Sequence, residues 1–145
     1  MTTLVTRTPE ETERAGADFA MQLKPGDIVA LTGTLGSGKT RFVAGACEAL
    51  GAGGHFGSPT FTLINEYPAG AITVVHADMY RISSRADLAE VGLAEYFRPP
   101  YVCFIEWAEH VLDLLPPGRY LIAFEHCGSE TERKITIREP DEGAS

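Results

Sequence analysis

Apolar residues follow two spacings along this chain, and these spacings predict both helices and strands. Ala15, Phe19 and Leu23 recur at every fourth position, as they would on one face of a helix. Residues 8–11 read Thr-Pro-Glu-Glu, a helix start in which Glu11 can complete a capping box. The run 27–32, DIVALT, is short, apolar and partly β-branched, which is typical of a strand buried on both faces.

Helices and strands continue to alternate along the rest of the sequence. The further elements predicted are a helix over 39–50, strands over 61–67 and 71–77 joined by a turn at 68–70, a helix capped by Ser83 or Ser84, a strand over 101–107, a short helix over 108–115, and an antiparallel pair over 119–126 and 134–139. This order indicates an α/β fold, a three-layer sandwich around a mixed, mostly parallel central sheet with antiparallel additions. We expect one domain over 1–139 and a flexible acidic tail over 140–145.

Composition and charge narrow the classes of partner. The net charge is −8 and only three lysines are present, so strong unaided binding to nucleic acid is not expected. The three cysteines, Cys47, Cys103 and Cys127, are widely spaced, which argues against a disulfide framework or a zinc site. No apolar stretch approaches the roughly 20 residues that span a bilayer, and no secretory signal is evident, so we expect no membrane association and a cytoplasmic protein.

A glycine-rich loop follows the first buried strand. Its residues are Gly33, Thr34, Leu35, Gly36, Ser37, Gly38, Lys39 and Thr40, and they match G-x-x-x-x-G-K-[ST] at every fixed position. Glycines let the backbone close around a phosphate, and the N–H groups of the following helix add positive potential. Lys39 then supplies a charge for the β- and γ-phosphates, and Thr40 a hydroxyl for Mg²⁺. The loop therefore predicts nucleoside triphosphate binding, and ATP is favoured because no Asn/Thr-Lys-x-Asp guanine motif is present.

Two carboxylates are candidates for the metal and water side of this loop. Glu106 ends the apolar run VCFIE, and acids at the carboxyl ends of buried parallel strands face the ligand. We expect Glu106 to bind magnesium, directly or through water, or to position the attacking water. Asp78 ends another strand-like run and is the second candidate, with a turn or helix cap as its ordinary interpretation. His76 is expected to be structural.

Other residues near these motifs carry weaker expectations. Ser58 and Thr60 in SPTF have hydroxyls that could meet a phosphate or metal, or simply begin a strand. Trp107 is expected to be an aromatic of the core or the rim, although stacking on a base or partner is an alternative. Thr12, Arg133 and Arg138 are the candidates for contacting adenine.

Several motifs in order resemble one family. GTLGSGKTRFVAG, SPTFTLINEY, HADMYRI, GLAEYF and IEWAE together resemble the TsaE (YjeE-like) family, the small ATPase of bacterial tRNA threonylcarbamoyladenosine synthesis. The resemblance implies binding of ATP and Mg²⁺, association with TsaB and TsaD, and action on adenosine 37 of tRNA through that complex. It gives Lys39 and Thr40 the phosphate and magnesium roles, makes Glu106 the metal-side carboxylate and Asp78 a residue needed for activity, and makes Thr60 a switch-like position.

The sequence departs from the family pattern at the loop, and it leaves other functions open. The usual loop reads GDLGAGKT, whereas Thr34 and Ser37 stand here in place of the acid and the alanine. Neither is a fixed position, so only a special role of an acid at position 34 is in doubt. One alternative is a small-molecule P-loop kinase, for which Arg81, Arg85 and Arg98 would be the lid arginines. The other is a nucleotide sensor that does not hydrolyse.

Overall fold

The computed structural model describes residues 1–34, 37–52, 64–82 and 84–140. Its helices and strands are β1 (Thr2–Thr6), α1 (Pro9–Ala20), β2 (Ile28–Thr32), α2 (Lys39–Ala49), β3 (Ile64–Ala69), β4 (Ile72–Asp78), α3 (Arg85–Val91), β5 (Tyr101–Glu106), β6 (Tyr120–His126) and β7 (Arg133–Arg138). Three 3₁₀ turns are added, η1 (Leu93–Tyr96), η2 (Ala108–His110) and η3 (Leu112–Leu114). Predictions for Leu35, Gly36, Ser58 and Thr60, and for the tail beyond Pro140, fall outside the described residues.

One mixed sheet organises these elements. Its seven strands lie in the order β1-β7-β6-β2-β5-β4-β3. The four central strands β6, β2, β5 and β4 are parallel to one another, while β7 runs antiparallel to β6 and β3 runs antiparallel to β4. The carboxyl ends of the parallel strands therefore meet at one edge of the sheet, where ligands bind in folds of this kind.

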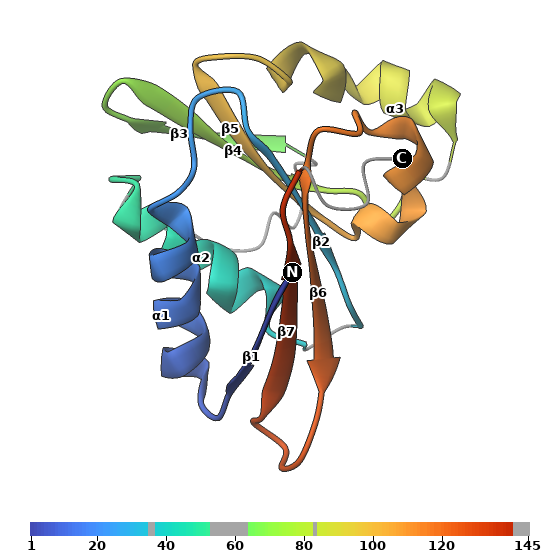
Figure 1. Ribbon diagram of the computed structural model, residues 1–145. Coiled ribbons are helices and arrows are strands. Elements are labelled where there is room, and N and C mark those ends of the chain that lie inside the picture. Colours follow the sequence, from blue (N-terminus) through green and yellow to red (C-terminus); the bar gives the residue numbers. More distant parts are fainter. Residues whose placement is uncertain (35–36, 53–63, 83, 141–145) are drawn as a thin grey trace.

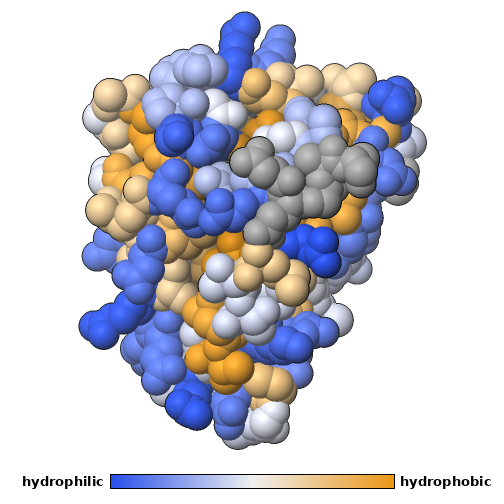
Figure 2. Space-filling view, viewed as in Figure 1, coloured by the Kyte–Doolittle hydropathy of each residue, from blue (hydrophilic) through white to orange (hydrophobic). Residues whose placement is uncertain are grey.

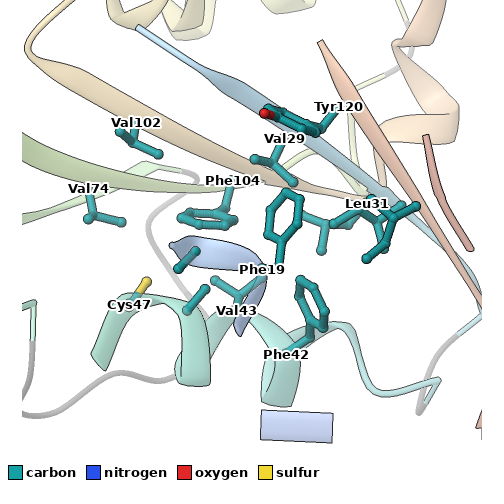
Figure 3. Close-up of a cluster of buried hydrophobic side chains, with 14 of the residues drawn as sticks. Phe19, Val29, Leu31, Phe42, Val43, Cys47, Val74, Val102, Phe104 and Tyr120 are labelled. Carbon is teal, nitrogen blue, oxygen red and sulfur yellow. The ribbon is translucent and has the colours of Figure 1, made fainter. Parts of the chain in front are cut away.

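Helices cover both faces of the sheet. Figure 1 shows α1 and α2 together on one face, and α3 with the short helical turns on the other. Alternate residues of β2 separate accordingly: Val29 and Leu31 pack under α1 and α2, and Ile28 and Ala30 pack toward the opposite side. Figure 3 shows the first of these clusters, with the rings of Phe19, Phe42 and Phe104 between the helices and the sheet. The predicted three-layer α/β architecture is confirmed.

The helix starts follow the sequence signals closely. The Thr8 hydroxyl accepts from Glu11 N at 3.1 Å, and the Glu11 carboxylate accepts from Arg7 N at 2.9 Å, so the glutamate reaches one residue further back than in a standard capping box. Ser84, not Ser83, caps α3, because its hydroxyl accepts from Asp87 N at 3.1 Å. Gly92 ends α3 in a left-handed conformation.

Two local predictions were wrong, and one strand was missed. The segment Thr2–Thr6 was not predicted as a strand, yet it pairs with β7 along its whole length. The expected turn at 68–70 begins later, because Pro68 lies within β3 opposite Thr73; a proline is tolerated there since β3 is an edge strand. The short helix expected over 108–115 is instead two 3₁₀ turns.

Hydrophilic residues dominate the visible surface (Figure 2), and two of the three cysteines are buried. Figure 2 shows hydrophilic residues spread over most of the visible face, with hydrophobic residues between them. Cys47 and Cys103 are buried, and burial raises the pKa of each thiol to about 12. None of the helices in the described part of the chain is long and apolar enough to cross a bilayer.

Candidate nucleotide-binding site

The glycine loop connects the end of β2 to the start of α2, at the carboxyl edge of the sheet. Gly33 and Gly38 have φ angles of 141° and 102°, which side chains rarely permit. A Cβ at Gly33 would also lie 2.7 Å from the Phe124 carbonyl oxygen, so a larger residue does not fit there. Gly38 is the N-cap of α2 and has no side chain to satisfy the first N–H groups of the helix. The loop and the helix N-terminus together form a site suited to an anion.

Lys39 is the first residue of α2, and its side chain is almost completely buried. The side chain is 4% exposed, and Nζ donates to the Gly33 carbonyl at 2.5 Å. Nζ also lies 3.8 Å from the centroid of the Trp107 ring, a cation–π contact. Burial lowers the pKa of Lys39, while the charges of Glu109, Glu106 and Asp78 act in the opposite direction. The ammonium is thus held at the loop by a carbonyl, an aromatic face and nearby carboxylates.

Thr40 and Glu106 meet directly. The Thr40 hydroxyl lies 3.1 Å from Oε1 and 3.3 Å from Oε2 of Glu106, to which it donates. Glu106 is the last residue of β5, opposite Leu31 of β2 and Asp78 of β4, and is 3% exposed. A second group, Nε2 of His76, contacts Glu106 Oε2 from inside the sheet. The sheet therefore places a buried carboxylate beside the hydroxyl at the start of α2.

A cavity of about 320 Å³ opens in front of these groups. It is lined by Pro9, Thr12, Ser37, Gly38, Lys39, Thr40, Arg41, Asp78, Glu106, Trp107, Thr131 and Arg133. One end therefore carries the loop, the lysine and the carboxylates. The cavity is also lined by Pro9 and Thr12 of α1, by Thr131 just before β7 and by Arg133 at its start, so its wall joins the first helix and the last strand to the loop.

Comparison with known proteins gives the family. The sequence profile described as "Threonylcarbamoyl adenosine biosynthesis protein TsaE" matches residues 6–135. A tRNA threonylcarbamoyladenosine biosynthesis protein TsaE of Bacillus subtilis (strain 168) is 41% identical over 129 residues, 89% of this chain and 80% of the relative. The TsaE of Treponema pallidum (strain Nichols) is 37% identical over 133 residues, 92% of this chain and 97% of the relative. The chain belongs to the TsaE family.

A solved structure supports the same conclusion. The crystal structure of Bacillus subtilis YdiB matches with a TM-score of 0.78 and 37% identity, covering 95% of this chain and 84% of that chain. The TsaE resemblance and the P-loop NTPase-like fold predicted from the motifs are confirmed. The assignment to tRNA threonylcarbamoyladenosine biosynthesis is also confirmed. This TsaE chain is thus a nucleotide-binding protein of that process.

The structure brings most of the predicted site residues of this TsaE chain together. Lys39, Thr40, Glu106 and Asp78 all line the cavity, as do Thr12 and Arg133, whereas Arg138 does not. The Asp78 carboxylate also accepts from Tyr80 N at 2.9 Å, so its ordinary role as a turn residue is present beside its position in the cavity. Thr34 is exposed, and its carbonyl accepts from Ser37 N at 3.1 Å.

Trp107 is a rim residue, as expected, but its contacts exceed that expectation. Its backbone has a φ of 58°, a left-handed conformation that is uncommon for a bulky residue. This turn directly after β5 points the ring over Lys39 and places it 4.9 Å from the ring of Tyr80. The tryptophan therefore forms the wall of the cavity beside Lys39.

The donor set of the cavity fits Mg²⁺ together with phosphate. Thr40, Glu106 and Asp78 offer hard oxygen donors, which Mg²⁺ prefers. Ser37 adds a buried hydroxyl that has no hydrogen-bond partner among the described residues, a group that a phosphate oxygen or water can satisfy. The described residues contain no cluster of three or more acidic, histidine or cysteine ligands, and Mg²⁺ does not need one because water and phosphate complete its shell.

Two contacts of the site were not foreseen from the sequence. Glu109 accepts from Gly33 N at 3.0 Å, and it is the carboxylate that most strongly opposes the lowered pKa of Lys39. His76, which was expected to be structural, contacts Glu106. The sequence hinted at both, since Glu109 belongs to IEWAE and His76 to HADMYR, but neither motif shows which atoms meet.

Proposed function

We propose that this TsaE-family chain binds ATP with Mg²⁺ and hydrolyses it in support of tRNA threonylcarbamoyladenosine biosynthesis. The observation that carries the proposal is the contact between Thr40 and the buried Glu106 in front of a glycine loop and a lysine. This combination of a phosphate cradle, a cation and a metal-side carboxylate is the equipment of phosphoryl transfer to water.

Each residue has a separate task in this proposal. The backbone N–H groups of the loop and of the first turn of α2 bind the phosphates, and Lys39 neutralises the β- and γ-phosphates. Thr40 and Glu106 hold Mg²⁺, directly or through water, and the ion offsets the charge of the phosphates when bound. Glu106 or Asp78 orients the water that attacks the γ-phosphorus, whose bond to the ADP oxygen breaks. Thr12 and Arg133 are placed to contact the base or ribose.

We further propose that TsaB and TsaD are the partners, and that tRNA is contacted mainly through them. The net charge of −8 favours proteins over the phosphate backbone as the direct partner. A P-loop ATPase alone often lacks a group that a partner supplies. We expect low ATPase activity of the isolated chain and a rise with both subunits, measured by phosphate release. Full activity that TsaB and TsaD leave unchanged would contradict this dependence.

Replacement of Lys39 tests nucleotide binding. Lys39→Ala removes the buried ammonium, and we expect affinity for an ATP analogue to fall about ten- to hundredfold, the loss for a charged hydrogen bond. Isothermal calorimetry measures this without relying on turnover. Lys24→Ala, which removes an exposed lysine after α1, is the matched control and should bind like the wild type. Equal affinities of the two variants would refute the site.

Replacement of Glu106 separates hydrolysis from binding. Glu106→Gln keeps the shape of the side chain but removes its charge, so we expect turnover to fall about a hundredfold or more while ATP binding persists. A non-hydrolysing sensor would instead retain its effect on threonylcarbamoyladenosine formation. Nothing favours the kinase alternative, because Arg81, Arg85 and Arg98 are exposed and none of them lines the described cavity.

A further inference from the structure

His76 occupies a position where an apolar residue would be the ordinary choice. It lies in β4 and is completely buried, with Val74 and Val75 before it and Ala77 after it in the same strand, all three also buried. An imidazole placed there costs free energy unless its polar atoms are satisfied. Its Nε2 contacts Oε2 of Glu106, so the polar ring is matched to a carboxylate of the proposed ATP site.

The sheet register explains why these two side chains meet. β4 and β5 are parallel, with His76 opposite Phe104 and Asp78 opposite Glu106. Side chains two residues apart share a face, so His76 and Asp78 lie on the same face of β4 as Glu106 does on β5. Asp78 and Glu106 line the cavity and His76 does not, which places His76 behind the carboxylate.

The Glu106 carboxylate therefore has a donor on each side. Thr40 donates to it from the cavity side, and His76 meets it from the interior. An ionised carboxylate can only accept hydrogen bonds, so the proton of the contact belongs on Nε2. A carboxylate with two fixed donors cannot rotate freely, because rotation would break both bonds.

We propose that His76 is a positioning residue that fixes the orientation of Glu106 toward Thr40 and Mg²⁺. The proposal rests on the proposed ATPase function, and it adds a residue that touches neither nucleotide nor cavity. A partner behind a metal-side group that sets its direction commonly accounts for ten- to hundredfold in activity or metal affinity.

Two isosteric substitutions separate this role from simple space filling. The amide nitrogen of a glutamine lies near the place of Nε2, whereas that of an asparagine lies near Nδ1. His76→Gln can therefore still donate to Glu106, and His76→Asn cannot. We expect His76→Gln to keep kcat within about threefold of wild type and His76→Asn to lose about tenfold or more, with KM for ATP little changed in both.

A second readout does not depend on turnover. The Mg²⁺ concentration needed for half-maximal binding of a non-hydrolysable ATP analogue should rise about tenfold in His76→Asn and stay near wild type in His76→Gln. Val75→Ala, a buried truncation in the same strand on its opposite face, should lower the melting temperature but leave both quantities unchanged. Equal behaviour of the glutamine and asparagine variants in kcat and Mg²⁺ dependence would overturn the proposal.

The free protein supplies a third readout. Nitrogen-15 NMR of His76 in the wild-type chain should show the proton on Nε2, and a ring without a proton there would overturn the proposal even if both variants failed to fold. The result also separates the two proposals. Failure of the wild-type protein to bind ATP would reject the proposed ATPase function. If the wild-type ring carries its proton on Nε2 but His76→Gln and His76→Asn behave alike in kcat and Mg²⁺ dependence, only the positioning role is rejected.

Discussion

The Lys39 ammonium is accommodated by a balance of opposing effects. Burial favours the neutral amine, and three carboxylates favour the charged form, so the pKa of Lys39 is lowered by less than burial alone would produce. Glu109 is the largest of the opposing charges, and it is held near the loop by its bond to Gly33 N. The charge state of Lys39 therefore depends on Glu109, a residue that does not line the cavity.

Removing the Glu109 charge should lower the pKa of Lys39 further. Glu109→Gln eliminates an attraction that favours the ammonium, and NMR titration of carbon-13-labelled lysine side chains measures the change. Because the pKa of Lys39 is lower in the folded than in the unfolded chain, the unfolded chain binds more protons between the two values, and stability rises with pH through that window. Because Glu109→Gln lowers the pKa of Lys39 in the folded chain further, it widens the pH range over which stability rises.

Glu48→Gln supplies the control for this measurement. Glu48 is exposed near the end of α2, far along the helix from Lys39, and its removal should leave the titration of Lys39 unchanged. A pKa of Lys39 that stays constant or increases in Glu109→Gln would contradict the balance described above.

At the scale of elements, α1 and α2 approach each other through two glycines. A Cβ at Gly16 would lie 1.9 Å from the Phe42 carbonyl oxygen, and a Cβ at Gly45 would lie 1.9 Å from the Glu13 carbonyl oxygen. The helix backbones thus touch without side chains between them. Since α2 begins with Lys39 and Thr40, this contact also fixes the helix that carries these two cavity residues.

Gly45→Ala should separate the two helices and destabilise the chain. Alanine favours an isolated helix by about 1 kcal/mol over glycine, but overpacking against a backbone costs about 1–3 kcal/mol, so the net change is a loss. Urea unfolding measures it. Gly118→Ala is the control, because a Cβ at Gly118 meets nothing within 4 Å, and its stability should change by less than about 0.5 kcal/mol. A stabilised Gly45→Ala variant would contradict the close contact.

The elements that the sequence predicted well are those whose signal is local. The strand at 27–32 and the helix from Lys39 follow from a continuous apolar run and a fixed motif. The strand Thr2–Thr6 has only one buried residue, Thr6, and its partner lies more than a hundred residues away, so no local pattern reveals it. Pro68 marked a turn by propensity, and only the edge position of β3 lets it remain in a strand.

In the site, too, residues marked by a local motif could be predicted, whereas contacts that depend on the fold could not. Lys39, Thr40 and Glu106 could be predicted because a motif and a strand end place them at the sheet edge. The ring of Trp107 over Lys39 could not, since it depends on a left-handed residue directly after β5. The contact of His76 with Glu106 depends on strand order, which places β4 beside β5 although α3 and η1 intervene in the sequence.

For the whole molecule, the sheet order predicts where the structure opens first. β2 lies between two parallel neighbours and is buried on both faces, whereas β1 and β3 are the edges. Amides that open only with global unfolding exchange slowest, so we expect β2 and β5 to be most protected and β1 and β3 least. Hydrogen exchange read by NMR tests this order. Protection of β1 equal to that of β2 would contradict it.

The pairing of β1 with β7 has a consequence for biosynthesis of the chain itself. Thr2 lies opposite Ile137 and Thr6 opposite Arg133, so β1 finds its partner during synthesis only after β7 has emerged from the ribosome. Until then residues 2–6 have no backbone partner in the sheet, and they stay exposed to nascent-chain chaperones and proteases. The β1 edge of the sheet is therefore completed only when residues 133–138 are outside the ribosome, and not already when they are translated.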